Sequence, residues 1–284
     1  MRVTEKKDWA KGVTLRHESY SDYMEFYETL ISRQGNAHRT IEKVFDDHER
    51  SWVGCSSVEE AKRLFLGGWD KPLKSLKEGI DKELDTIERS SRTRMRAAPC
   101  GFAPIVPNAI MGLPNAMLAP VKERTGAKVL RFLISISRSC SESAEAIIRK
   151  MSRILAQIAS LERSGAYRCR LEVFFPAFGG KRQNGDKWSV SCSILVKSED
   201  QPFDAMRLCY PVINPSMLRL LVFAWAESLP LPYDDYYVSG YGHAFEWWDR
   251  DSKEAFVDAV REDGERPICV DLNTDVMDTL KGRR

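Results

Sequence analysis

The chain has 284 residues, 43% of them hydrophobic and 10% aromatic, and its formal net charge at pH 7 is +2. This composition is typical of a globular protein and excludes a fibrous repeat or wholesale disorder. No stretch approaches the roughly 18 to 20 consecutive apolar residues of a transmembrane helix, and the opening MRVTEKKDWAKG lacks the apolar core of a signal peptide. We therefore expect a cytoplasmic protein.

Residues 1–96 are predicted to form an α-helical region. Apolar side chains recur every three or four positions over residues 20–31 and again over 73–87, which is the spacing of a buried helix face. Between these stretches, Ser57 and Glu60 form a Ser-x-x-Glu capping box. That pattern predicts a short helix beginning just after Ser57.

A basic run closes this helical region. Its four arginines lie within eight residues and have no acidic residue between them: Arg89, Arg92, Arg94 and Arg96. Such a run can bind phosphates and predicts a sequence-independent nucleic-acid site. In that hypothesis the acidic segment 227–278, with fourteen acidic and four basic residues, turns away from the polyanion. The alternative is a solvated helix end, where cations complement the helix dipole.

Residues 97–127 are rich in proline and apolar at the same time. Prolines interrupt any regular element, but the residues between them are too apolar for a flexible linker. We expect an ordered, extended strap that packs across the surface of the molecule. A proline-rich recognition segment is the alternative.

Residues 128–284 are predicted to form an α/β domain of helix–sheet–helix sandwich type. A β-rich apolar run over 129–136 indicates a central strand, and a long amphipathic helix follows it. Strands over 168–175 and 188–196 flank strong turn chemistry and predict a long hairpin. Residues 203–212 fit a strand or a helix equally well. A last strand is predicted from residue 266.

An aromatic cluster lies between the last two predicted elements. It mixes tyrosines and tryptophans with acidic residues and includes Tyr236, Tyr237 and Trp247. Tyr and Trp are enriched at the centres of protein interfaces, so the cluster is a candidate partner site. A loop that buries its own rings is the alternative.

A hydroxyl-rich loop, Ser135-Ile-Ser137-Arg-Ser139, joins the first predicted strand to the long helix. This junction resembles that of von Willebrand factor A-like domains, whose central strand ends in Asp-x-Ser-x-Ser. The resemblance covers about residues 128–284, where the order of helix, strand, hairpin and third strand is also similar. It implies a Rossmann-like fold and a divalent-metal loop that captures a partner, with Ser137, Ser139 and, from a later loop, Asp204 as ligands.

Ser135 departs from that family's pattern because it stands where the metal-binding Asp belongs. Hard cations prefer charged oxygen ligands, so a neutral hydroxyl stabilises a dication far less than a carboxylate does. We therefore expect a degenerate loop with no cofactor, which binds a partner protein through Ser135, Ser137 and Ser139.

Enzyme motifs are absent from the sequence: it has no dinucleotide-binding glycine pattern, P-loop, His-Glu-x-x-His or Gly-x-Ser-x-Gly elbow. A split active site stays open, with His243 in a glycine-flanked loop as a possible general base. The seven cysteines are scattered and never form a Cys-x-x-Cys pair, which indicates reduced thiols without zinc or disulfides.

Two hypotheses follow. The first is a non-catalytic protein-interaction module that binds at the carboxyl edge of the sheet. The second is a nucleic-acid-binding protein that uses the arginine run. Trp52-x-Gly54 and Gly68-Trp69 also resemble uncharacterised tailed-bacteriophage proteins, which implies a viral or prophage origin and a location in the host cytoplasm.

Overall fold

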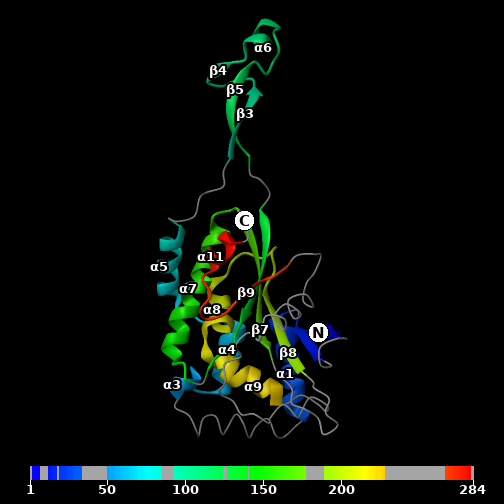
Figure 1. Ribbon diagram of the computed structural model, residues 1–284, viewed down its shortest axis with the longest axis vertical. Helices are drawn as coiled ribbons and strands as arrows, with labels where there is room; N and C mark the ends of the chain where they lie inside the picture. The colour runs from blue at the N-terminus through cyan, green and yellow to red at the C-terminus, as the bar shows by residue number, and fades with distance from the viewer. Residues whose placement is uncertain are drawn as a thin grey trace.

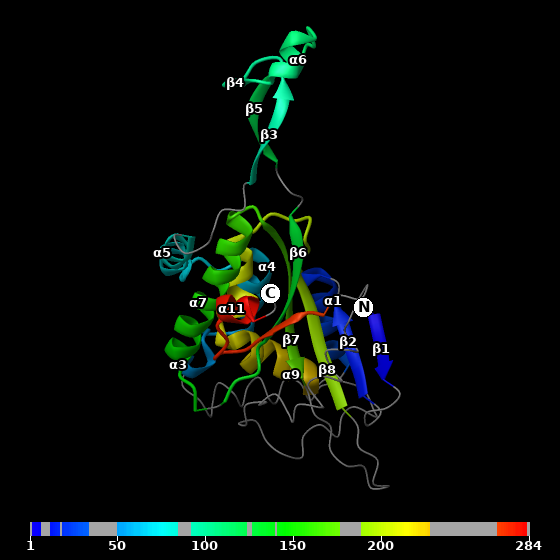
Figure 2. The same ribbon diagram turned by 45° about the horizontal axis from the view of Figure 1, so that its top comes forward.

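The computed structural model describes residues 2–6, 12–17, 19–33, 50–84, 92–123, 127–139, 141–176, 189–227 and 266–282. It is a mixed α/β protein with two parts (Figures 1 and 2). One part is a body in which helices pack on a six-stranded sheet, and the other is a narrow arm, residues 92–123, that extends from one end of the body.

The body's sheet has the strand order β1-β2-β8-β7-β6-β9. β6 pairs in parallel with β7 and β9, β7 pairs with β8 antiparallel, and β8 pairs with β2 in parallel. The strands span β1 (Arg2–Lys6), β2 (Gly12–His17), β6 (Lys128–Ser135), β7 (Tyr167–Pro176), β8 (Ser189–Lys197) and β9 (Ile268–Val270).

The N-terminal strands correct the prediction that residues 1–96 form an α-helical region, because β1 and β2 are strands. β1 and β2 form a hairpin, and β2 continues the C-terminal sheet by pairing with β8, so that Gly12 faces Ser189 and His17 faces Ile194. The sheet therefore crosses the predicted boundary. Such a pairing joins segments about 177 positions apart, and local periodicity carries no information about it.

The helices of the body surround one hydrophobic core. They are α1 (Tyr20–Arg33), α3 (Arg50–Val53), α4 (Val58–Gly67), α5 (Leu73–Leu84), α7 (Ala144–Arg163), α8 (Ala205–Ile213), the π-helix η1 (Met217–Val222), α9 (Phe223–Glu227) and α11 (Val276–Lys281). All of them contribute side chains to the core that also takes alternate residues of β6, β7 and β8. Among the described residues this is a single layer of helices, so the second layer of the expected sandwich is not found in that part of the chain.

The central strand β6 shows why the sheet forms where it does. Phe132 and Ile134 point into the core and are fully buried. Arg131 lies on the other face, where its Nη2 is 3.1 Å from the carboxylate of Glu172, and Ser193 donates a 3.0 Å hydrogen bond to the same carboxylate. Burial of each large apolar side chain contributes roughly 1.5–3 kcal/mol, so the apolar face stabilises the sheet. The ion pair makes the opposite face compatible with burial.

Two local predictions are confirmed. α4 begins after Ser57, whose hydroxyl accepts a 3.0 Å hydrogen bond from the Glu60 amide, and the Glu60 carboxylate in turn accepts one from the Ser56 amide at 2.7 Å. The long helix α7 begins after Ser143, which caps it in the same way. Both helices start where a side-chain oxygen satisfies an otherwise free amide.

The ambiguous segment 203–212 is helical. Asp204 caps α8 by accepting a hydrogen bond from the Arg207 amide at 3.2 Å. Among the described residues no single helix is long and apolar enough to span a membrane. α8 and residues 217–225 pass that test jointly by length and composition, and they are bent by 61° relative to each other.

Candidate functional site: an arm with an apolar tip

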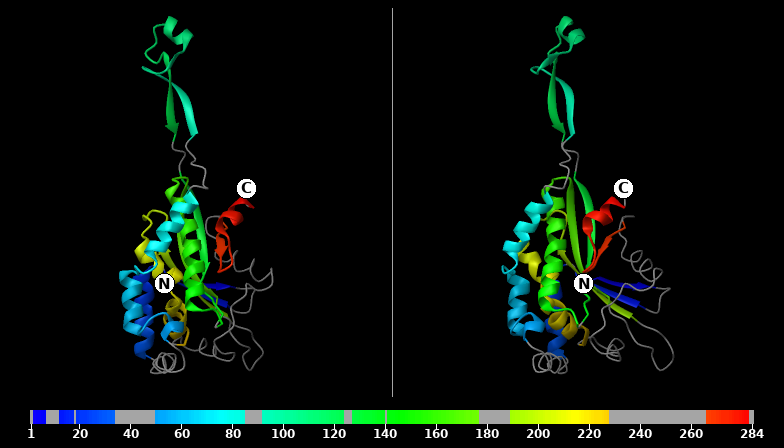
Figure 3. Two further views of the ribbon diagram at one scale, coloured as in Figure 1. Left: turned by 90° about the vertical axis from the view of Figure 1, so that its left-hand side faces the viewer. Right: turned by 60° about the vertical axis from the view of Figure 1, so that its left-hand side comes forward.

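The arm is built on a small antiparallel sheet of its own. β3 (Arg92–Ala98) pairs along its whole length with β5 (Met117–Glu123), and β4 (Ala103–Pro104) adds a short third strand beside β5. The short helix α6 (Val106–Ile110) lies at the far end. Figures 1 and 3 show this sheet extending away from the body along the long axis of the molecule.

This geometry corrects two predictions. The segment 97–127 does not pack across the body surface as a strap, because its apolar residues pair within the arm or face outward. The arginine run is also not a helix end: Arg92, Arg94 and Arg96 lie in β3, whereas Arg89 lies outside the described residues. The alternation of arginine with Thr93 and Met95 is a strand pattern of period two.

The turn at the end of the arm depends on a close backbone approach. Gly101 passes so near to β5 that a β-carbon there would overlap the carbonyl oxygen of Leu118. The next amide, that of Phe102, donates a 3.0 Å hydrogen bond to this oxygen. Asn108 then closes the tip by donating from its side-chain amide to the carbonyl oxygen of Asn115 at 3.1 Å.

The tip presents large apolar side chains to the outside. Six of the eight large apolar side chains that the described residues expose belong to the arm. Their exposed fractions are Ile110 80%, Phe102 66%, Met111 64%, Val106 58%, Met95 53% and Leu113 45%. Residues 97–121 include no charged residue. Several large exposed apolar side chains within one segment make this end of the arm the candidate interaction surface of the described residues.

The predicted serine loop is held from the inside by two buried arginines. Arg138 donates hydrogen bonds of 2.6 Å to the carbonyl oxygens of Ser135 and Ser137. Arg219, from η1, donates to the carbonyl oxygen of Ser139 at 3.4 Å. Burial lowers the pKa of Arg138 to about 9, which still leaves the guanidinium charged at neutral pH. The loop is therefore a packed junction.

Within this junction the serines differ in exposure. Ser135 is 3% exposed, so its side chain cannot contact a partner, and its place in the predicted site is wrong. Ser137 and Ser139 are half-buried, and the Ser139 hydroxyl lies 2.9 Å from that of Ser141. Partner binding by Ser137 and Ser139 stays a prediction.

The predicted metal ligands do not come together. Ser137 and Ser139 follow the carboxyl end of β6. Asp204 follows β8, which runs antiparallel to β7, so β8 ends towards the amino ends of β6 and β7. Asp204 is also engaged as the cap of α8. Among the described residues, no three His, Cys, Asp or Glu side chains are grouped so as to hold a metal ion.

Comparison with family models matches residues 5–266 to a family described as a domain of unknown function, DUF7192. The chain belongs to the DUF7192 family. No curated protein and no solved structure matched the chain.

The predicted aromatic site of this DUF7192 chain lies outside the described residues. Tyr236, Tyr237, Trp247 and the candidate base His243 all fall within residues 228–265. The sequence analysis gave a recognition segment over residues 97–127 only as the alternative to a surface strap, and it did not predict an exposed apolar tip. The proline-rich segment 97–127 carried a sign of this surface. It is too apolar for a linker, and its apolar residues lack the helical or strand spacing that would place them in the core.

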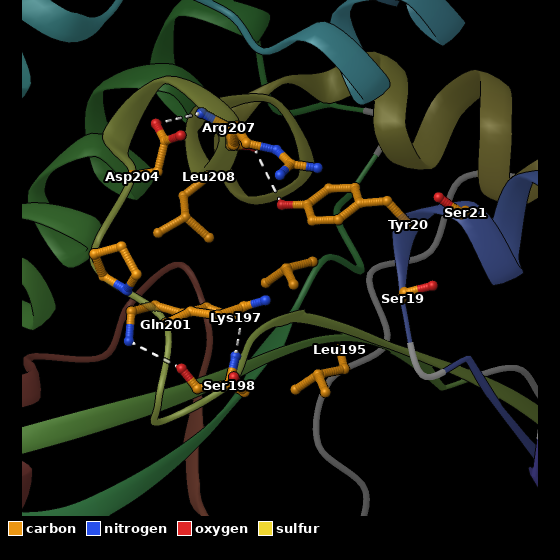
Figure 4. A pocket seen from close by; sticks show the side chains of 12 residues that line it. Ser19, Tyr20, Ser21, Leu195, Lys197, Ser198, Gln201, Asp204, Arg207 and Leu208 are labelled. Carbon is orange, nitrogen blue, oxygen red and sulfur yellow. Dashed lines mark hydrogen bonds between the residues drawn. The ribbon is translucent and has the colours of Figure 1, made fainter.

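A hollow of about 360 Å³ lies where β2 and β8 end and α1 and α8 begin (Figure 4). Its polar groups are engaged in structural contacts. The Tyr20 hydroxyl donates to the Arg207 carbonyl oxygen at 3.2 Å, and Lys197 donates to the Cys169 carbonyl oxygen at 2.8 Å and pairs with Glu162 at 3.0 Å. Burial raises the pKa of Tyr20 well above its usual value, so this phenol is a protonated donor and not a base.

The buried cysteines of the DUF7192 chain have the properties of packing residues. Burial raises the pKa of Cys55 to about 11 and those of Cys169 and Cys209 to about 12. The thiolate is the reactive form, so these protonated thiols are poor nucleophiles.

Proposed function

We propose that this chain is a non-catalytic protein-interaction module that binds its partner through the tip of the arm. The observation that carries the proposal is the exposure of Ile110, Phe102 and Met111, at 80%, 66% and 64%, on a projecting β-sheet. A tip held away from the body can enter a partner's groove without a clash between the two bodies.

The energetics favour a protein over water as the environment of the tip. Each large apolar side chain that becomes buried contributes roughly 1.5–3 kcal/mol before the costs of association are subtracted. Aromatic and methionine side chains are enriched at interface centres, and charged ones are depleted there. The tip has this composition, because Phe102 and Met111 lie in a segment without charged residues.

The body then serves as the rigid base of the arm. A von Willebrand A-like body of bacteriophage or prophage origin is part of this proposal. The strand order β8-β7-β6-β9 supports the von Willebrand A-like part of the proposal, because β6 leads through the long α7 to a parallel β7 and β7 leads to an antiparallel β8. The proposal includes no metal or other cofactor, since Ser135 is a neutral, buried group where that family has an aspartate.

The proposal is tested by affinity capture with the full-length chain from cells of its source. The tip variant replaces Phe102, Ile110 and Met111 with Ser. A matched control replaces Leu66 and Met206, exposed apolar residues of the body at 47% and 44%, with Ser. We expect one protein to be enriched equally by the wild type and the control and lost with the tip variant. Retention by the tip variant, or equal loss with the control, contradicts the proposal.

A further inference from the structure

The outer edge of β3 is a second open surface of the arm. β3 is an end strand of the arm's sheet, whose order is β3-β5-β4, and no other strand among the described residues pairs with its second side. In Figure 1 and in both views of Figure 3 the arm stands clear of the helices and strands of the body. A strand with one unpaired edge is a template on which a further strand can form.

The hydrogen bonds of β5 show which residues of β3 face this open edge. The carbonyl oxygen of Leu118 accepts a 3.0 Å hydrogen bond from the Phe102 amide, on the β4 side of β5. The backbone groups of a strand point alternately to its two sides, so the neighbouring Ala119 faces β3. Its partner there is Arg96, whose amide and carbonyl groups therefore face β5.

By the same alternation, three residues of β3 direct their amide and carbonyl groups to the open edge: Thr93, Met95 and Ala97. Met95 is 53% exposed, and Ala97 is exposed as well. Each of the three residues has one N–H donor and one C=O acceptor in its backbone. A strand laid beside β3 would bond these groups without disturbing the pairing of β3 with β5.

The other open edge of the arm is blocked by a proline. β4 pairs with β5 at Met117 and Leu118, and no strand among the described residues lies beyond them on that side of β5. Pro120 faces that side by the same alternation, and it has no N–H to donate. Proteins use proline in this way to protect an edge from a further strand. β3 contains no proline, so its edge is the one that can accept a strand.

The charge of the arm selects the kind of strand that this edge accepts. Residues 92–123 include four basic residues and one acidic residue, and β3 itself has three arginines and no acid. Like charges on neighbouring strands destabilise their pairing, whereas opposite charges stabilise it. A second copy of β3 would bring arginines beside arginines. The edge therefore favours an acidic strand from a different protein.

We propose that β3 binds an extended acidic segment of the partner by strand addition, as a fourth strand of the arm's sheet. Backbone hydrogen bonds at Thr93, Met95 and Ala97 align this segment. β3 runs towards the apolar tip, so the same partner reaches the tip and buries its side chains there (Figure 1). This inference rests on the proposed function, because it takes the occupant of the edge to be the protein that the tip binds.

The first test measures fluorescence anisotropy of labelled peptides of about eight residues, long enough to span β3, with the full-length protein. The acidic probe alternates Glu with Val, and the basic probe alternates Lys with Val. A third probe is the acidic peptide with every backbone amide N-methylated. We expect the acidic probe to bind saturably with a Kd below about 1 mM. The basic probe should bind at least about tenfold more weakly, and the N-methylated probe should not bind.

Met95→Pro tests the edge from the side of the protein. It removes one outward N–H and leaves the bonds between β3 and β5 in place, because the Met95 amide faces away from β5. Met95→Ala is the matched control, which shortens the same side chain and keeps the N–H. We expect Met95→Pro to raise the Kd of the acidic probe at least about tenfold and Met95→Ala to change it less than about threefold. Slow hydrogen exchange of the Arg96 amide verifies that β3 stays paired in both variants.

Residue-resolved hydrogen exchange of the wild-type protein tests the edge without a substitution. Saturation with the acidic probe should slow exchange at the amides of Thr93, Met95 and Ala97 at least about fivefold. The Arg96 amide, which already bonds to β5, should change little. Equal slowing along the whole strand would show that the probe tightens the arm and does not add a strand.

Four results would overturn the proposal. The first is no saturable binding of the acidic probe, and the second is equal binding of the basic or the N-methylated probe. The third is an equal loss in Met95→Ala and Met95→Pro. The fourth is self-association of the wild-type chain in sedimentation that Met95→Pro abolishes, which would make a second copy the occupant of the edge.

Partner capture separates this inference from the proposed function. If the tip variant loses the partner and Met95→Pro retains it, strand addition is wrong and the tip proposal stands. If the tip variant retains the partner, the proposed function is wrong, whatever the peptides show. Loss of the partner in both variants, with retention in Met95→Ala, is the result that the two proposals together predict.

Discussion

The guanidinium of Arg219 lies 4.0 Å from the centroid of the Trp52 ring, and its Nη1 donates a 2.6 Å hydrogen bond to the Trp52 carbonyl oxygen. Its Nη2 donates to the carbonyl oxygens of Ser139 and Glu142. One buried cation in the π-helix thus fixes both α3 and the loop that follows β6. π-helical turns are rare and occur frequently at functional sites.

Arg219→Met should lower the free energy of unfolding by about 3–5 kcal/mol, because it leaves several buried carbonyl oxygens without a donor. Arg219→Lys should not restore stability, since an ammonium group cannot replace the planar fork. Urea denaturation monitored by tryptophan fluorescence measures both. A loss below about 1 kcal/mol in Arg219→Met would show that the contacts are incidental.

The stability of the fold should fall in mild acid because of His17. Burial lowers the pKa of His17 in the folded chain to about 4, from an ordinary value of 6.5, and Asp22 at 3.8 Å opposes the shift only in part. The unfolded chain therefore takes up a proton near pH 6.5 while the folded chain does not. His17 therefore makes its full contribution to the free energy of unfolding above pH 6.5. This contribution, on the order of 3 kcal/mol, is lost as the pH falls towards 4.

Urea denaturation at a series of pH values between 7.5 and 4.5 measures this dependence. The matched variant is His17→Phe, which keeps a ring against Tyr23, whose ring centroid lies 5.1 Å away. It should flatten the curve over this range. An unchanged pH dependence in His17→Phe would assign the effect to other groups.

Gly101→Ala should disturb the arm and leave the body intact. The added methyl group would overlap the Leu118 carbonyl oxygen, so the turn must shift and the bond from Phe102 is lost. Hydrogen exchange should become faster over residues 101–118, and the melting temperature of the body should stay within about 2 °C. Gly67→Ala in α4, where the added atom meets nothing within 4 Å and φ is not positive, controls for the removal of a glycine without a clash.

Apolar residues of the tip should contribute little to stability. Ile110 is 80% exposed, so Ile110→Ser should change the free energy of unfolding by less than about 0.5 kcal/mol. Phe132→Ala, in the core, should cost about 3–5 kcal/mol. Chemical denaturation compares them. A large loss in Ile110→Ser would mean that the tip packs against the body.

The sequence predicted those parts of the fold that depend on neighbouring residues. The capping box at Ser57, the buried strand over β6 and the amphipathic α7 were predicted, because each is encoded within about twenty residues. The pairing of β2 with β8 was not, because no local pattern links Gly12 to Ser189. The alternate arginines of β3 follow the period of two of a strand, although the run was predicted as part of a helical region.

The candidate sites were likewise predictable only where they depend on neighbouring residues. The serine loop lies at the carboxyl end of β6 as expected. Its packing depends on Arg138, which donates to the Ser135 carbonyl oxygen, and on Arg219, which donates to the Ser139 carbonyl oxygen from about eighty positions away. The sequence does hold one sign that Arg219 has a structural role, because it is the single charged residue within the apolar run 217–225. The exposure of Ile110 could not be deduced, since an apolar segment normally packs on a core.

Site-specific photo-crosslinking at position 110 tests the central claim most directly. A photoreactive residue replaces Ile110 in the full-length chain, and a second variant carries it at exposed Lys74 on the body as the control. If the tip is a protein interface, irradiation in cells of the source should give one discrete protein adduct from position 110 and none of that mass from position 74. No adduct from position 110, or the same adduct from both positions, would contradict the account.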